Sequence, residues 1–266
     1  MPELPLNQAS GLLGLADTAG PQLIAVVSHG DERSELPSLW QLCAALVELD
    51  YTVTVLDATH SESADNPGLQ QLLEYRFGYG PVESYASEWN VLPAAQGIHS
   101  LCVPDVTLDT APLQRIGHLF GAHCIVILFA RADTLGSLLE GSGVQPLICV
   151  SNEKNSLLSS YLTLKHLLIH ARLHPTLLNR AGGPHNRESA HAGSVCGNLR
   201  TCARNFLGYE VNAITIDTSL SELQQSATMR RLALRLLESA LPLQQGACAQ
   251  AAGAAASHPD AMGRSH

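Results

Sequence analysis

The sequence is poor in lysine and in charged residues of either sign. Only two of its 266 residues are lysines, Lys154 and Lys165, and charged residues make up 15% of the chain, against roughly 25% in an ordinary soluble domain. Acidic residues outnumber basic ones by 24 to 15, so the formal net charge is −9. Because a nucleic-acid-binding surface needs clustered lysine and arginine, we expect no direct contact with nucleic acid.

Long apolar runs and paired cysteines are also missing. No apolar stretch reaches the roughly 18 residues of a membrane-spanning helix, and no basic segment precedes an apolar one at the N-terminus. The seven cysteines form no Cys-x-x-Cys pair and no zinc-site spacing. We therefore predict a cytoplasmic protein with reduced cysteines and no metal site.

Apolar residues, at 45% of the chain, come in short runs that alternate with amphipathic stretches. This alternation predicts an α/β fold: a doubly wound, mostly parallel sheet of about seven strands with helices on both faces. The expected strands are residues 23–28, 52–57, 100–103, 124–129, 146–151, 176–179 and 211–216. The expected helices are residues 36–50, 67–75, 112–120, 156–171, 187–206 and 226–240.

The chain divides into three parts. Residues 1–21 precede the first strand as a separate segment, and residues 22–243 carry the α/β domain. Residues 244–266 consist mainly of alanine, glycine, serine and histidine, with too little apolar bulk to offset the entropy of ordering. We expect this last part to be a disordered tail.

Four short segments, taken in their order along the chain, point to a family resemblance. They are Trp89–Gly97 (WNVLPAAQG), Val150–Ser156 (VSNEKNS), Leu177–Arg180 (LLNR) and Asn205–Glu210 (NFLGYE). In this order, and together with the alternating strands and helices, they resemble segments of the MinD/ParA branch of P-loop ATPases. Within that branch the chain resembles the flagellar-number regulators FlhG and FleN, over about residues 4–243. This resemblance implies a MinD/ParA-like P-loop fold.

The N-terminal segment Asn7–Leu13 resembles the D-Q-A-x-x-L-R motif of those regulators. Gln8, Ala9 and Leu12 match the motif, while Asn7 and Leu13 replace its aspartate and arginine. In the family this motif contacts the partner GTPase FlhF, so the resemblance implies that Gln8, Ala9 and Leu12 are partner-binding residues. The alternative is an ordinary frayed terminus without a binding role.

The phosphate-binding loop of the family reads G-K-G-G-V-G-K-[ST], and the aligned residues here are His29–Leu36 (HGDERSEL). Glu35 stands at the P-loop lysine position and Leu36 at the magnesium-ligand position. Asp31, Glu32 and Glu35 would bring three carboxylates to a place where phosphates need donors. The fourth strand ends without the Walker B aspartate. We therefore expect a degenerate nucleotide site and no ATP hydrolysis.

A remnant of the nucleotide site is still recognisable. It would consist of Gly30 and Ser34 in the loop, Asp57 at the end of the second strand, and Asn179, whose equivalent reads adenine in relatives. Without a phosphate cradle, however, the sequence favours structural roles for both: Asp57 as a strand-end turn residue, and Asn179 as a residue that caps its strand and packs against the sheet. We expect no bound cofactor and no catalytic residue; ATP with Mg²⁺ remains the alternative if the degenerate site still binds.

The resemblance implies a regulatory binding protein that controls flagellar number or placement through protein contacts. The implied partners are an FlhF-like GTPase, a flagellar C-ring protein or a flagellar transcription activator. One alternative is an ATP-dependent dimerising switch of the MinD/ParA type, and another is a MinD-like positioning protein of a different secretion system. The last expected helix carries three arginines among leucines, a pattern that fits a packed helix or peripheral contact with the inner face of the cell membrane.

Overall fold

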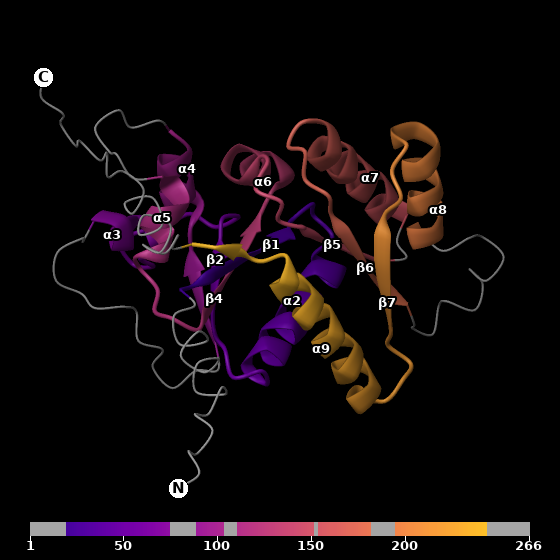
Figure 1. The fold of residues 1–266 in the computed structure, drawn as a ribbon, viewed down its shortest axis with the longest axis horizontal. Helices are drawn as coiled ribbons and strands as arrows, with labels where there is room; N and C mark the ends of the chain where they lie inside the picture. The colour runs from indigo at the N-terminus through magenta and orange to yellow at the C-terminus, as the bar shows by residue number, and fades with distance from the viewer. Residues whose placement is uncertain (1–19, 75–88, 104–110, 152–153, 182–194, 244–266) are drawn as a thin grey trace, which may run out of the picture.

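The computed structural model describes residues 20–74, 89–103, 111–151, 154–181 and 195–243. These residues form one eight-stranded sheet with the strand order β3-β2-β4-β1-β5-β6-β7 and with β8 beside β1 (Figure 1). The strands are β1 Gln22–Val27, β2 Thr52–Asp57, β3 Trp89–Pro93, β4 Cys124–Ala130, β5 Leu147–Val150, β6 Thr176–Ala181, β7 Asn212–Asp217 and β8 Leu241–Pro242. Only β8 among them runs antiparallel to its neighbour. The predicted α/β fold with a doubly wound sheet is confirmed.

Helices cover both faces of this sheet (Figure 1). They are α2 Glu32–Val47, α3 Leu69–Glu74, α4 Ala95–Cys102, α5 Pro112–Gly117, α6 Ala132–Leu139, α7 Lys154–Ile169, α8 Val195–Cys202 and α9 Glu222–Glu238, and a π-helical turn, η2, continues α8 over Ala203–Leu207. Helices α2 and α9 pack on one face, and the remaining helices pack on the other. Side chains of β1 alternate between the two cores, because successive strand residues point to opposite faces: Leu23 joins one core and Ile24 the other.

The third strand differs from the prediction. Residues 100–103 were expected to be a strand, but Ser100–Cys102 end helix α4, and the strand is Trp89–Pro93. Two causes favour the helix. Ile98 and Leu101, three residues apart, are both buried on its inner side. The buried carboxylate of Glu62 also accepts hydrogen bonds from the backbone N–H groups of Gln96 and Gly97, at 2.8 and 2.9 Å, which stabilises the N-terminus of α4.

Helix α2 begins four residues earlier than expected. Asp31 is its N-cap residue, so Pro37 lies inside the helix instead of in the first turn. The Asp31 side chain makes no capping hydrogen bond to the helix; its Oδ2 accepts one from the backbone N–H of Ser151 just after β5, at 3.1 Å. The start of α2 is therefore fixed by a strand 120 residues away, which sequence spacing does not reveal.

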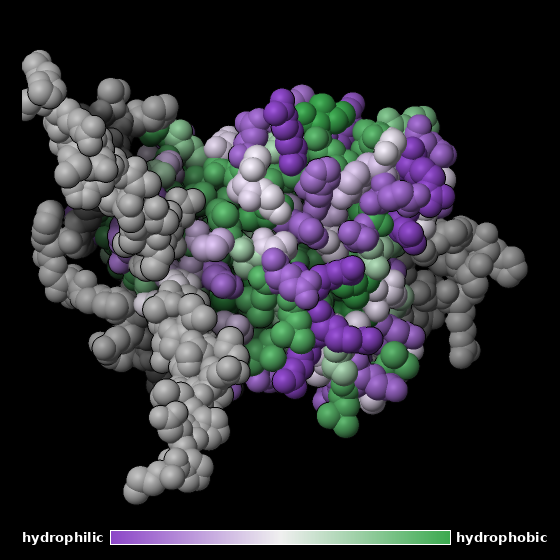
Figure 2. Space-filling model, viewed as in Figure 1, coloured by the Kyte–Doolittle hydropathy of each residue, from purple (hydrophilic) through white to green (hydrophobic). Residues whose placement is uncertain are grey.

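The surface mixes polar and apolar residues. Figure 2 shows hydrophobic side chains in groups among hydrophilic ones on the face seen. Helix α9 buries Met229, Leu232, Ala233 and Leu236 against the core and leaves its arginines exposed, so it is a packed helix. No helix in the described part of the chain is long and apolar enough to cross a membrane.

Candidate functional site

The loop between β1 and α2 occupies the middle of the sheet at the carboxyl ends of the strands. Strand β1 pairs with β4 on one side and β5 on the other, so the strand order reverses here. Ligands of open α/β sheets bind in the crevice outside the carboxyl ends of the strands at such a reversal. The loop is therefore the first place to look for a functional site.

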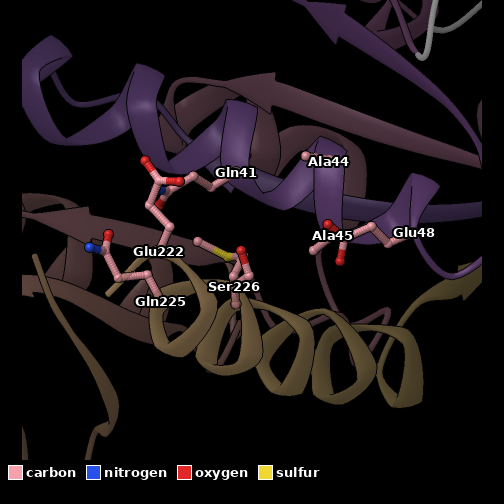
Figure 3. Close-up of a pocket in the computed structure, with 8 residues that line it drawn as sticks. Gln41, Ala44, Ala45, Glu48, Glu222, Gln225 and Ser226 are labelled. Atoms are coloured by element: carbon pink, nitrogen blue, oxygen red, sulfur yellow. The ribbon is translucent and has the colours of Figure 1, made fainter. Parts of the chain in front are cut away.

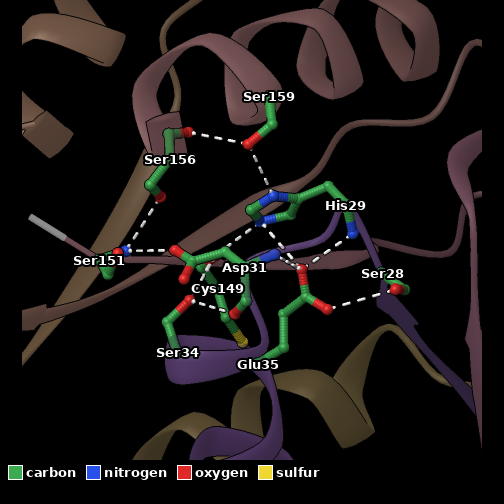
Figure 4. A network of polar contacts seen from close by, with 9 residues as sticks. All are labelled: Ser28, His29, Asp31, Ser34, Glu35, Cys149, Ser151, Ser156 and Ser159. Atoms are coloured by element: carbon green, nitrogen blue, oxygen red, sulfur yellow. Dashed lines mark hydrogen bonds and ion pairs between the residues drawn. The ribbon is translucent and has the colours of Figure 1, made fainter. Parts of the chain in front are cut away.

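A carboxylate from the helix fills the hollow of this loop (Figure 4). Oε1 of Glu35 accepts hydrogen bonds from the backbone N–H groups of His29 and Asp31, both at 2.9 Å. Its Oε2 accepts a hydrogen bond from the Ser28 hydroxyl at 3.2 Å, and Glu35 is only 1% exposed. The backbone donors of the loop thus point at an acidic side chain of the same chain.

His29 joins the loop to β5 and α7. Its side chain is 2% exposed, and Nε2 lies 2.7 Å from the carbonyl oxygen of Cys149, so Nε2 carries a hydrogen and donates it. Nδ1 lies 3.1 Å from the Ser159 hydroxyl, in the second turn of α7. The same ring stands 3.6 Å from Oε1 of Glu35. One imidazole therefore contacts the loop carboxylate, the end of β5 and helix α7.

Asp31 and Ser34 close the loop from the helix side. Ser34 is buried, and its hydroxyl is 3.2 Å from the carbonyl oxygens of both Asp31 and Cys149. Burial raises the pKa of Asp31, but hydrogen bonds from Ser156, Ser151 and Ser34 outweigh that effect and leave the pKa below its ordinary value of 3.8. Asp31 is therefore an ionised, internally bonded carboxylate at neutral pH.

The structure brings together only some of the predicted site residues. Gly30, with φ +89°, lies in the loop, and Ser34 lies next to it in the first turn of α2. Asp57 ends β2 and Asn179 lies in β6, each two strands from β1, which is about 10 Å at the usual strand spacing. Gln8, Ala9 and Leu12, the predicted partner-binding residues, lie outside the described residues, as does the predicted tail.

Asp57 and Asn179 have different local settings. The Asp57 carboxylate accepts hydrogen bonds from the Thr59 backbone and hydroxyl, at 2.9 and 2.6 Å, and Oδ2 lies 2.8 Å from Nδ1 of His60. These contacts form a strand-end turn. Asn179 is 4% exposed, and its Oδ1 has no hydrogen-bond partner among the described residues. Its neighbour Arg180 donates to Oε1 of Gln41 at 2.8 Å.

Sequence reasoning missed how the loop carboxylates are used. It grouped Asp31, Glu32 and Glu35 as three charges facing the same space, yet Glu35 is inside the loop, Asp31 faces β5 and Glu32 is exposed. It did not name His29 as a site residue. The available signal was the short spacing between Glu35 and two residues that can bond to its carboxylate, Ser28 and His29.

Two pockets lie elsewhere. The larger, of about 340 Å³, opens between α2 and α9 and carries glutamine and glutamate side chains from both helices; Glu222 extends from α9 toward Gln41 (Figure 3). The second, of about 240 Å³, lies near the ends of β2 and β4 and includes His99, Cys102 and Asp133. Neither pocket is lined by a residue of the loop. The acidic lining of the first is unsuited to a phosphate.

No family model and no curated protein matches the chain in sequence. Solved structures do match its fold. Cobyrinic acid a,c-diamide synthase from Mycobacterium smegmatis, with a bound ATP analog and magnesium, aligns at 14% identity over 82% of this chain and 95% of that chain, with a TM-score of 0.53. A chain of the MinC:MinD cell division protein complex of Aquifex aeolicus aligns at 14% identity over 84% of this chain and 99% of that chain, with a TM-score of 0.50. A ParA family ATPase from Chlorobium tepidum aligns at 13% identity over 83% and 93%, with a TM-score of 0.46. The chain has the α/β fold of the MinD/ParA-like P-loop ATPases.

Proposed function

We propose that this chain is a regulatory binding protein that keeps the MinD/ParA-like fold and acts through protein contacts without hydrolysing ATP. The observation that carries the proposal is the position of Glu35. Its carboxylate accepts the N–H groups of His29 and Asp31, donors of the kind that cradle phosphates in a P-loop. A phosphate would have to displace this buried carboxylate and then sit beside the ionised Asp31.

The position of the family's magnesium-binding hydroxyl has lost its ligand atom. Leu36, at the position of the magnesium-binding hydroxyl, is an exposed apolar residue. Strand β4 ends at Ala130, which is fully buried, where a Walker B aspartate would be expected. Phosphoryl transfer depends on the metal and on positioned charges, so the loss of both supports a role without hydrolysis.

Calorimetric titration with ATP and magnesium tests this proposal. We expect no binding heat up to millimolar ATP. The M. smegmatis synthase, whose structure holds an ATP analog with magnesium, serves as the positive control under the same conditions. Micromolar binding by this chain would refute the proposal and favour the ATP-dependent dimerising switch instead.

An exposed stripe on α7 supports a role in protein contacts. Leu158, Leu162 and Ile169 are 64%, 55% and 53% exposed and follow one another at helical spacing on the outer side of the helix. The same helix is tied to the loop through Ser159 and His29. Large apolar side chains grouped on a surface are typical of protein–protein contacts.

The partners that we propose follow the resemblance to flagellar-number regulators: an FlhF-like GTPase, a flagellar C-ring protein or a flagellar transcription activator. Contact with the GTPase would use Gln8, Ala9 and Leu12. We expect Q8A to lower the affinity for that GTPase and to alter flagellar number, while L13A, at a position that departs from the family motif, serves as the matched control. Unchanged binding and motility for Q8A would remove this partner.

Peripheral membrane contact is a separate proposal. It would use the exposed Arg230, Arg231 and Arg235 of α9 together with Leu234, because anionic headgroups attract arginine. Co-sedimentation with vesicles that contain anionic lipid, compared with purely zwitterionic vesicles, tests it. Equal recovery in the two would exclude it.

A further inference from the structure

The hydrogen bonds that the Glu35 carboxylate accepts come from neutral donors. Two backbone N–H groups and one hydroxyl point at it, and no lysine or arginine of the described residues forms an ion pair with it. The His29 ring, 3.6 Å away, is its nearest ionisable partner. Loops that aim successive N–H groups at one point are known anion-binding concavities. At 1% exposure, the carboxylate is enclosed as a bound anion would be.

We propose that the loop between β1 and α2 is a small-anion site whose resident ligand is the carboxylate of Glu35, and that the vacated site binds a small monocarboxylate such as acetate. The inference does not depend on the proposed function, because it concerns only what the loop donors hold. In the native chain the ligand is built in, so the loop and its bonds to β5 and α7 form without any bound molecule.

The size of the site sets the ligand class. Truncation of Glu35 to alanine removes one methylene and the carboxylate, which is the heavy-atom content of acetate. The Oε1 position already receives two N–H donors and Oε2 receives a hydroxyl, so a carboxylate satisfies the donors present. A phosphate carries more oxygens and more charge, and the ionised Asp31 beside it disfavours the additional charge.

The substitution E35Q is a control with almost the same shape. Its amide leaves no space for an added anion, and its NH₂ group would face a donor instead of accepting from it. A second control is E32A, which removes an exposed carboxylate from the same turn of α2. Only E35A should therefore both lose stability and open the site.

The experiment is thermal unfolding of the full-length native protein, E35A, E35Q and E32A in rising sodium acetate, with sodium chloride at matched ionic strength. We expect E35A to unfold at a lower temperature and to regain stability with acetate in a saturable manner, as a ligand that binds only the folded state requires. The other three proteins should show equal shifts in acetate and chloride. If E35A does not fold alone, its refolding yield with acetate against chloride gives the same readout.

Three outcomes would overturn the inference. One is an E35A protein as stable as E32A, which would mean that the carboxylate holds nothing. Another is an E35A protein that responds identically to acetate and chloride, in both unfolding and refolding. The third is stabilisation of E35A by inorganic phosphate and not by acetate, which would assign the site to a different anion class. Because all three are measured without ATP, they leave the titration that tests the proposed function unaffected.

Discussion

Substitution of Glu62 by glutamine should destabilise the domain strongly, although Glu62 is not part of the loop. This carboxylate is 5% exposed and accepts three backbone N–H groups: Gln70 and Gly97 on Oε1, at 3.2 and 2.9 Å, and Gln96 on Oε2, at 2.8 Å. One side chain thus satisfies the first turns of both α3 and α4. A glutamine offers a single oxygen, so at least one buried donor loses its acceptor.

The size of the effect follows from these contacts. A buried donor without an acceptor costs about 1–3 kcal/mol, and loss of the negative charge at helix N-termini adds roughly 0.3–1 kcal/mol. We therefore expect E62Q to lower the free energy of unfolding by about 1–4 kcal/mol. For a domain of this length each 1 kcal/mol lowers Tm by about 2–4 °C.

Urea unfolding followed by tryptophan fluorescence measures this change. Both tryptophans, Trp40 and Trp89, stack with ring centroids 6.0 Å apart on α2 and β3, so their emission reports on packing of the sheet edge. The control is E74Q, because Glu74 is exposed and accepts a hydrogen bond only from the Gln70 side chain at 2.8 Å among the described contacts, which an amide oxygen can also accept. A difference of less than about 0.5 kcal/mol between E62Q and E74Q would refute the reasoning.

Two further changes test other parts of the structure. G68A should lower the free energy of unfolding by about 1–3 kcal/mol, because an added Cβ would clash with the carbonyl oxygen of Pro93, a backbone atom that cannot move alone. Unfolding in urea measures this loss of stability. Native-like stability of G68A would contradict the close approach of the two segments. D31N should destabilise the protein at neutral pH, because the pKa of Asp31 is lowered in the folded state. A carboxyl with a lowered pKa stabilises the folded state above the unfolded value of about 3.8, and this stability is lost as the pH falls through the lower native value. The difference in free energy of unfolding between the native protein and D31N, measured from pH 7 to pH 3, should therefore shrink in acid. A constant difference would mean that ionisation of Asp31 is not involved.

The sequence predicted best those elements whose signal is local. Strand β2 was predicted to the residue, since Thr52–Asp57 begins with four β-branched residues in succession and ends in a turn-forming aspartate. Helix α6 was missed, because its eight residues include Thr134 and Gly136, which weaken the helical signal. The two residues of β8 are too few to form a pattern, and they pair with a strand from the other end of the domain.

The site was predicted in part. Comparison with a P-loop located the loop and marked Glu35 and Leu36 as departures from a nucleotide site. It could not show that Glu35 turns back into the loop, because that depends on where the His29 and Asp31 backbones point. Nor could it show the Cys149 carbonyl oxygen as an acceptor, since contacts across more than 100 residues leave no trace in local spacing.

The central place of β1 has a consequence for synthesis on the ribosome. Strand β1 is the first strand made, but its full-length neighbour β4 begins only at Cys124, about 100 residues after Val27. At about 5–20 residues per second, this apolar strand waits roughly 5–20 s without a partner strand. Helix α2 follows directly and can shield the side of Ile24 and Val26, whereas the side of Leu23, Ala25 and Val27 has no cover until later helices emerge. During that interval the nascent chain exposes an apolar strand surface to chaperones and to other chains.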